Sequence, residues 1–98
     1  MPVFILMIKV KPDNNNPQVQ QVAGAYVNCF LETRTFDLAE ETALKFLKEN
    51  LWLPITLEES WEVTEEDYEN DPAGLEVYKQ VLTDKEVYTF HTYETEED

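Results

Sequence analysis

The feature that most constrains the fold is an apolar run near the start of the chain. Residues 3–10 read VFILMIKV, and Lys9 is the only charged residue among them. Because neither alternate set of positions is polar, the run predicts a strand covered on both faces, or covered on one and used for association on the other. Residues 11–21 are rich in Pro, Asn and Gln and predict a long loop, and residues 24–33 predict a second strand. We expect these two strands to form an antiparallel hairpin.

Two helices are predicted from capping signals. Asp37, with Glu40 three positions later, is typical of a capping box and predicts a helix that ends near Asn50. Asp71 followed by Pro72 predicts a second helix, because Asp is a favoured N-cap and Pro fits the first helical position. This helix is expected to extend to about residue 82.

Two further strands are predicted at residues 55–63 and 86–93, and a short helical turn at residues 65–69. The alternation of the first strand places its apolar residues on one face: Ile55, Leu57, Trp61 and Val63. In the second, Tyr88 and Phe90 share one face and His91 and Tyr93 share the other.

The predicted order of elements is therefore ββαβαβ over a single α+β domain at residues 1–98. Strand–helix–strand units require crossover connections, which predicts a four-stranded mixed sheet with both helices on one face. This is a two-layer sandwich, ferredoxin-like in style although not in the order of its elements. Residues 94–98 are expected to form a charged tail.

The charge of the chain is strongly acidic and unevenly distributed. The net charge is −14; residues 1–57 hold six acidic and five basic residues, whereas residues 58–98 hold fifteen and two. Such a surface disfavours nucleic acid and anionic membrane as partners and permits a basic protein. Cys29 is the only cysteine, which excludes an internal disulfide. With no apolar run long enough for a transmembrane helix, we expect a cytoplasmic protein.

Four residues are candidates for binding: Glu59, Trp61, His91 and Tyr93. Glu59 falls on the apolar side of its predicted strand, so it is either a general acid or a residue at a bulge or on an edge strand. Cys29 and His91 could form part of a nucleophilic site, but Cys29 alternates with apolar residues and fits a core position better. No catalytic residue is assigned.

Metal and cofactor sites are not expected. Zinc requires three or four Cys or His ligands, and the chain has one of each. Phosphate-binding loops need clustered glycines, and the two glycines lie far apart at positions 24 and 74.

Several segments resemble a family of small acidic bacterial proteins without an assigned function. They are GAYVN at residues 24–28, the helix after Asp37, SWEVTEEDY at residues 60–68, Asp71-Pro72, and FHT at residues 90–92. The resemblance implies a bacterial, cytoplasmic, single-domain protein, and it implies no catalytic residues.

The function expected from these observations is a non-enzymatic protein-interaction module or a homodimer. Two strands with apolar residues on both faces need cover that helices on one face cannot supply, which favours a second copy or a docked partner. One alternative is a nucleic-acid mimic or immunity-type inhibitor that covers a basic site. A second is a small acid–base enzyme or ligand-binding domain with a pocket near His91, Tyr93 and Glu59.

Overall fold

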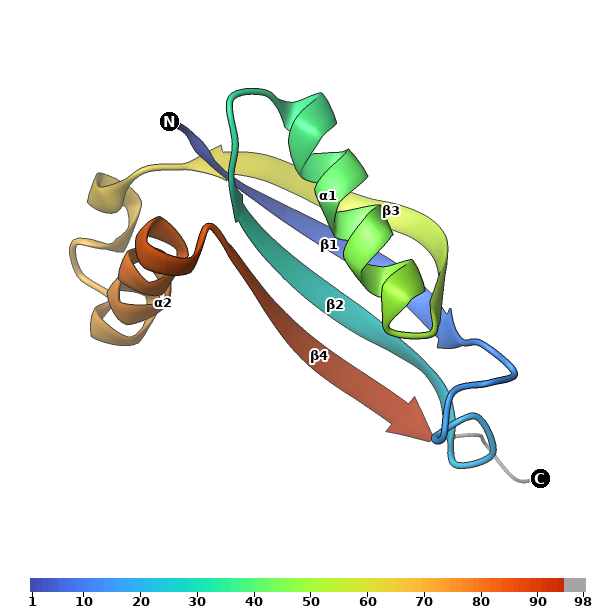
Figure 1. The fold of residues 1–98 in the computed structure, drawn as a ribbon. Helices are drawn as coiled ribbons and strands as arrows, with labels where there is room; N and C mark the ends of the chain where they lie inside the picture. The colour runs from blue at the N-terminus through green and yellow to red at the C-terminus, as the bar shows by residue number, and fades with distance from the viewer. Residues whose placement is uncertain (95–98) are drawn as a thin grey trace.

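The computed structural model describes residues 1–94 and contains one four-stranded sheet with two helices (Figure 1). The fold is therefore α+β, as predicted. Its elements are β1 (Val3–Pro12), β2 (Val22–Glu32), α1 (Phe36–Glu49), β3 (Trp52–Val63), the 3-10 helix η1 (Glu65–Tyr68), α2 (Pro72–Asp84) and β4 (Glu86–Glu94).

The strands are arranged in the order β3-β1-β2-β4, and every neighbouring pair is antiparallel. β1 and β2 form the predicted hairpin, with Val3 opposite Glu32 and Val10 opposite Ala25. This hairpin occupies the centre of the sheet, and β3 and β4 form its two edges. The central position of β1 explains why its sequence is apolar at both sets of alternate positions.

Three parts of the predicted architecture are wrong. The sheet is antiparallel throughout rather than mixed, because the β2–α1–β3 crossover joins parallel strands that are separated by β1. The two helices pack on opposite faces rather than on one, since each belongs to a different core cluster. The strand order also differs from that of ferredoxin-like domains, so the predicted likeness in style is wrong, whereas the predicted element order ββαβαβ is confirmed.

The larger core lies between α1 and one face of the sheet. Its buried residues include Leu6 and Ile8 from β1, Val27 from β2, and Ala43 and Leu47 from α1. These side chains are almost completely removed from water, and their burial is the main favourable contribution to the stability of the domain.

The smaller core lies under α2 on the opposite face. Val81 packs there with Val3, Ile5 and Val63, while Phe30 and Val87 are partly buried beside them. All these sheet residues lie near the end of the sheet at which β1 begins. α2 consequently covers only one end of this face, as Figure 1 also shows.

The predicted alternation of β3 is wrong because the strand contains two irregularities. Its register against β1 shifts between Met7 and Ile8 and again between Lys9 and Val10, which leaves Glu58 and Ile55 without partners. Leu57 consequently lies on the α1 face. Trp61, Val63 and Glu59 lie on the other face, so a one-residue insertion reverses the orientation of the residues beyond it.

The predicted N-cap is correct for α2 and wrong for α1, whereas α1 ends at Glu49 with Asn50 as its C-cap, as predicted. Asp71 caps α2, as predicted, by accepting a hydrogen bond from the backbone N–H of Gly74 at 3.1 Å. The N-cap of α1 is Thr35 rather than Asp37, because the Thr35 hydroxyl accepts from the N–H of Leu38 at 3.2 Å. Thr is also a favoured N-cap, so the helix begins two residues earlier than the Asp37 signal predicts.

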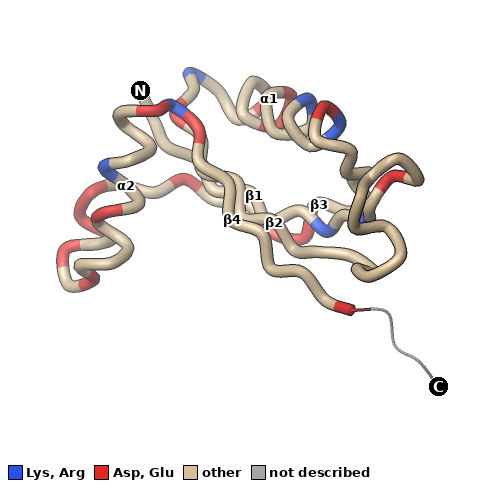
Figure 2. The backbone as a smooth tube through the Cα atoms, turned by 60° about the horizontal axis from the view of Figure 1, so that its bottom comes forward, with Lys and Arg blue, Asp and Glu red and all other residues tan. Residues whose placement is uncertain are grey.

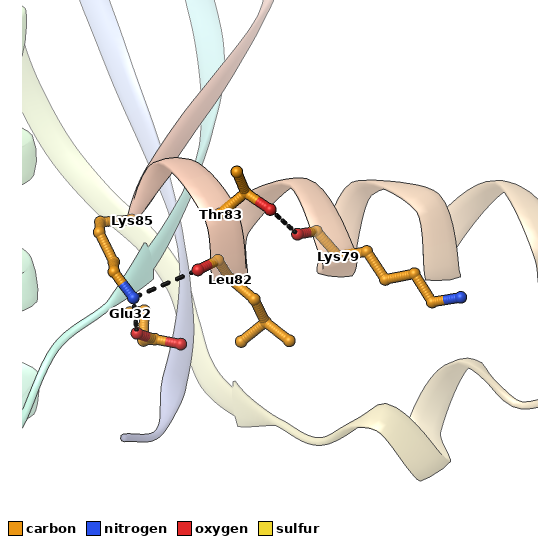
Figure 3. Close-up of polar contacts among 5 residues, drawn as sticks. All are labelled: Glu32, Lys79, Leu82, Thr83 and Lys85. Carbon is orange, nitrogen blue, oxygen red and sulfur yellow. Dashed lines mark hydrogen bonds and ion pairs between the residues drawn. The ribbon is translucent and has the colours of Figure 1, made fainter.

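At its other end α2 is joined to β2 by an ion pair. Lys85 has a left-handed backbone (φ 73°) as the C-cap, and its Nζ lies 2.7 Å from Oε1 of Glu32 (Figure 3). The same ammonium group donates to the carbonyl oxygen of Leu82 at 3.2 Å. Lys85 thus fixes the turn through which the chain enters β4.

The predicted charged tail at residues 94–98 falls mostly outside the described residues, and Glu94 belongs to β4. Within residues 1–94, no helix combines the length and the apolar character that crossing a membrane requires.

Candidate interaction surface

The face of the sheet that carries α2 is uncovered beyond the end of that helix. One row of side chains there crosses three strands, since Lys9 pairs with Tyr26 and Tyr26 pairs with His91. We call the exposed region the half-face; it comprises Met7, Lys9, Tyr26, Asn28, Glu59, Thr89, His91 and Tyr93. Tyr26 and Tyr93 are 38% and 37% exposed, and their rings lie 5.7 Å apart between centroids.

All four predicted binding residues lie on this face of the sheet, but they do not converge. Glu59 and Trp61 are on β3, whereas His91 and Tyr93 are on β4 at the opposite edge. Three strand spacings of about 4.8 Å separate the two edges by roughly 14 Å. The structure therefore does not bring Glu59 into one pocket with His91 and Tyr93.

Cys29 and His91 are on opposite faces of the sheet. Cys29 pairs with Tyr88 and is fully buried under α1, whereas His91 is exposed on the half-face. Burial raises the pKa of the Cys29 thiol to about 12, which keeps it protonated at neutral pH. The thiol is thus a core group, as its alternation with apolar residues predicted.

The two edge strands of the sheet, β3 and β4, differ in how well they are protected against pairing with a strand of another chain. β3 carries Pro54, two register irregularities and the exposed carboxylates of Glu58 and Glu59. Proline, bulges and charges are the features that prevent pairing at an edge strand. The outer edge of β3 is therefore protected against strand addition.

β4 has none of these protections. It pairs with β2 without interruption from Glu86 to Tyr93, and residues 87–93 contain no proline and no acidic, lysine or arginine residue. Alternate backbone N–H and C=O groups of an edge strand point away from its neighbour and are free to pair. β4 is thus an open edge.

On the α1 side, β4 is flanked by two hollows. One has a volume of about 390 Å³ and is lined by Glu86 at the start of the strand and by residues of α1 that include Glu41, Lys45 and Glu49. The other, of about 260 Å³, lies beside Phe90 and is lined by Asn16, Gln18, Asn50 and Trp52 among others.

Phe46 separates these two hollows. Its ring stacks on Tyr88, with centroids 3.7 Å apart and an interplanar angle of 1°. Burial, followed by the charge of Glu86, raises the pKa of Tyr88, whose hydroxyl donates to Oε1 of Glu86 at 3.2 Å. Tyr88 is therefore neutral near pH 7, and its ring lies against Phe46.

On the opposite side of the sheet, a third hollow of about 480 Å³ lies at the far end of β4. It is lined by Lys9, Ala23, Tyr26, Tyr93 and Glu94. The backbone edge of β4 is consequently bordered by recesses on both faces. We call the edge and these three hollows the β4 site.

The charge of the β4 site is acidic at one end. Three carboxylates (Glu41, Glu49 and Glu86) and one ammonium group (Lys45) surround the hollow at the start of β4. Figure 2 shows a second concentration of Asp and Glu around α2 and the segment before it, while α1 carries both signs. An electropositive ligand is therefore favoured at the start of β4.

Sequence reasoning identified two residues of this site, His91 and Tyr93, but not the site itself. The acidic hollow joins α1 to the start of β4, two elements separated by some forty residues in the sequence. The only sequence signal for the open edge was the uncharged stretch between Glu86 and Glu94.

Among residues 1–94, no three His, Cys, Asp or Glu side chains are grouped closely enough to hold a metal ion. Comparison with known proteins gave no match to a family model, to a curated protein or to a solved structure.

Proposed function

We propose that this protein is a non-enzymatic protein-interaction module that binds an extended, basic segment of another protein as a fifth strand beside β4. The observation that carries the proposal is the contrast between the edges. β3 is protected by proline, bulges and carboxylates, whereas β4 is regular, uncharged between Glu86 and Glu94, and bordered by hollows. Strand addition uses such an edge for affinity and the neighbouring recesses for specificity.

The positions of the hollows define the side chains of the bound segment. Glu86 and Phe90 lie four residues apart on the α1 side of β4, so the residues opposite them in a fifth strand are also four apart, about 13 Å. The residue opposite Glu86 enters the acidic hollow, which favours Lys or Arg. The residue opposite Phe90 meets amide and aromatic groups, which suit a polar or aromatic side chain.

A second copy of β4 fits this site less well than a basic segment. If two copies paired antiparallel about Phe90, Glu86 of each would lie opposite Glu94 of the other, and like charges in directly opposed positions are destabilising. Each chain also has a net charge of −14, so association of two copies is opposed by repulsion over longer distances.

The test uses a blocked nine-residue peptide of alternating Lys and Thr, and the same peptide with Glu in place of Lys. We expect the lysine peptide to bind at least tenfold more tightly in fluorescence anisotropy, which corresponds to about 1.4 kcal/mol. Hydrogen exchange should show slowed amides in residues 87–93, because the outward N–H groups become paired. Equal binding of the two peptides, or protection at β3 instead of β4, would contradict the proposal.

Charge reversal in the acidic hollow provides the matched variant. Glu41→Lys with Glu49→Lys should weaken binding of the lysine peptide several-fold, because both carboxylates line the hollow. Glu76→Lys with Glu66→Lys makes the same change of charge on exposed residues outside the β4 site and should have a much smaller effect. Sedimentation of the unliganded protein shows whether it forms a dimer, and hydrogen exchange shows whether the dimer protects the β4 amides. A dimer with protected β4 amides would mean that a second copy occupies the site, and would overturn the choice of a basic partner.

A further inference from the structure

A separate hollow of about 260 Å³ opens where α2 meets the uncovered part of the sheet. Its floor belongs to two neighbouring rows of side chains. In the first row Ile5 pairs with Trp61 on one side and with Phe30 on the other, and in the second row Met7 pairs with Asn28. Trp61 is 42% exposed although it lies in a strand, whereas Ile5 belongs to the smaller core. The floor thus reaches from an open rim to buried side chains.

The helical side of the hollow depends on Gly74, in the first turn of α2. A Cβ atom on Gly74 would lie 2.6 Å from Cδ1 of Tyr68, so the Tyr68 ring occupies the space that a side chain at this position would need. Val77, about one turn further along the helix, completes this side. Tyr68 therefore joins Trp61 and Phe30 as the third aromatic residue of the lining.

None of the residues that line the hollow is charged. A charged ligand group would lose water there without gaining a partner of opposite charge, which is costly. The hollow consequently favours an uncharged ligand. A cavity of about 150 Å³ with apolar walls is sufficient for benzene, so the larger volume here suits a molecule of one or two rings.

The carboxamide of Asn28 gives the hollow a polar group without a partner. The side-chain amides of Asn16 and Asn50 donate to backbone carbonyl oxygens, whereas that of Asn28 makes no hydrogen bond with any of residues 1–94. No buried side-chain N or O atom in that range lacks a partner, so the polar atoms of Asn28 are open to solvent. Asn is uncommon in strands, and β2 is a central one. The amide offers two donors and an acceptor, which match those of an amide on a ligand.

From these observations we infer that the hollow binds an uncharged aromatic molecule of one or two rings that carries an amide group. Its ring packs among the aromatic residues of the lining, where offset and edge-to-face contacts are favourable. Its amide pairs with Asn28. The occupant is a free molecule, because a ring system of this size fits entirely within the hollow. The inference does not depend on strand addition, since no residue of β4 lines this hollow.

Titration of the unmodified protein with benzamide tests the inference by nuclear magnetic resonance. We expect saturating shifts of the Trp61 indole N–H and of the backbone amides of Asn28 and Val77, with a Kd in the millimolar range. The indole of Trp52, which is 7% exposed in the other core, is the internal control and should not shift. Benzoate and benzamidinium have the same ring and opposite charges, and each should bind at least about threefold more weakly. Equal or tighter binding of either ion would overturn the inference.

The decisive variant is Asn28→Leu, because Leu has nearly the shape of Asn and no polar atom. We expect it to weaken benzamide binding about three- to tenfold. Thr89→Val is the matched control, since Thr89 pairs with Asn28 in the same row but does not line the hollow, and it should leave binding unchanged. An unaffected Asn28→Leu variant, or shifts that do not saturate, would overturn the inference.

A blocked amino acid separates a free ligand from a side chain of another protein. N-acetylphenylalaninamide carries the same ring on a peptide backbone, which is too large to enter the hollow together with the ring. We expect it to bind no more tightly than benzamide. Tighter binding would mean that a protein side chain occupies the hollow, and would overturn the choice of a free molecule.

Discussion

The side-chain amide of Asn16 donates a hydrogen bond to the carbonyl oxygen of Leu51 at 2.9 Å, and thereby joins the tip of the β1–β2 hairpin to the residue before β3. The same carbonyl oxygen accepts from the backbone N–H of Asp13 at 2.9 Å. Asn16 also accepts from the N–H of Gln18, and it is only 5% exposed. Leu51 itself has a left-handed backbone (φ 66°), so this junction holds a conformation that a β-carbon disfavours.

We expect Asn16→Ala to lower the free energy of unfolding by about 1–3 kcal/mol, because it removes the two hydrogen bonds of a side chain that is only 5% exposed. Chemical denaturation measures the loss. Asn14→Ala is the control, since Asn14 is exposed in the same loop, and its effect should stay within about 0.5 kcal/mol. Equal losses for the two variants would show that the Asn16–Leu51 contact does not stabilise the tip.

At the α2–β4 turn, two effects of Lys85 can be separated. Lys85→Met keeps the left-handed backbone and removes the ammonium group, leaving the Glu32 side chain, 8% exposed, without its partner. We expect a loss of about 1–3 kcal/mol. Lys85→Gly removes the same ion pair but relieves the backbone at φ 73°, which returns about 1 kcal/mol. Thermal or urea unfolding should therefore rank Lys85→Gly as more stable than Lys85→Met, and the opposite order would contradict this account.

Alkaline pH should destabilise the fold through Cys29. Burial raises the pKa of the Cys29 thiol from 9.0 to about 12. At pH values between 9.0 and about 12, the thiol is therefore deprotonated in the unfolded chain and still protonated in the folded chain. The folded state then binds more protons, and stability falls as pH rises above about 9, by up to about 4 kcal/mol near pH 12. The raised pKa of Tyr88 acts in the same direction. Urea unfolding at pH 7 and pH 10.5 should show the loss, and Cys29→Ala should reduce it; an unchanged pH dependence in that variant would contradict the role of the thiol.

Gly24 is required by close packing on the half-face. A Cβ at this position would collide with the Tyr93 hydroxyl and would lie 2.8 Å from the backbone oxygen of Val10. We expect Gly24→Ala to cost about 1–3 kcal/mol. Tyr93→Ala should relieve only part of this cost, because the Val10 carbonyl belongs to the paired backbone of β1 and cannot move away. A double-mutant cycle measures the relief, and complete recovery would mean that the tyrosine alone causes the clash.

Local patterns in the sequence were sufficient to predict the elements but not their arrangement. The capping of α2 by Asp71 and the hairpin of β1 and β2 depend on neighbouring residues, and both were predicted correctly. The strand order depends on long-range pairing, and the orientation of Leu57 depends on one unpaired residue, Glu58. Neither has a periodic signal in the sequence.

The candidate site likewise combines residues that the sequence indicates with an arrangement that it does not. Composition predicts His91 and Tyr93 as candidates, because they are polar and aromatic residues of a strand with apolar residues on both faces. Glu59 and Trp61 were grouped with them because the sequence does not show that β3 and β4 are opposite edges. The acidic hollow at the start of β4 requires α1 and β4 to be placed against each other, which only the tertiary structure provides.

The central position of β1 and β2 also bears on how the chain is assembled during synthesis. The first 32 residues form the middle of the sheet, and β3 and then β4 join its two outer sides. As the chain leaves the ribosome, the hairpin is therefore complete before either of its neighbours exists. The sheet can grow outward from its centre in the order of translation, and no strand has to be inserted between two that are already paired.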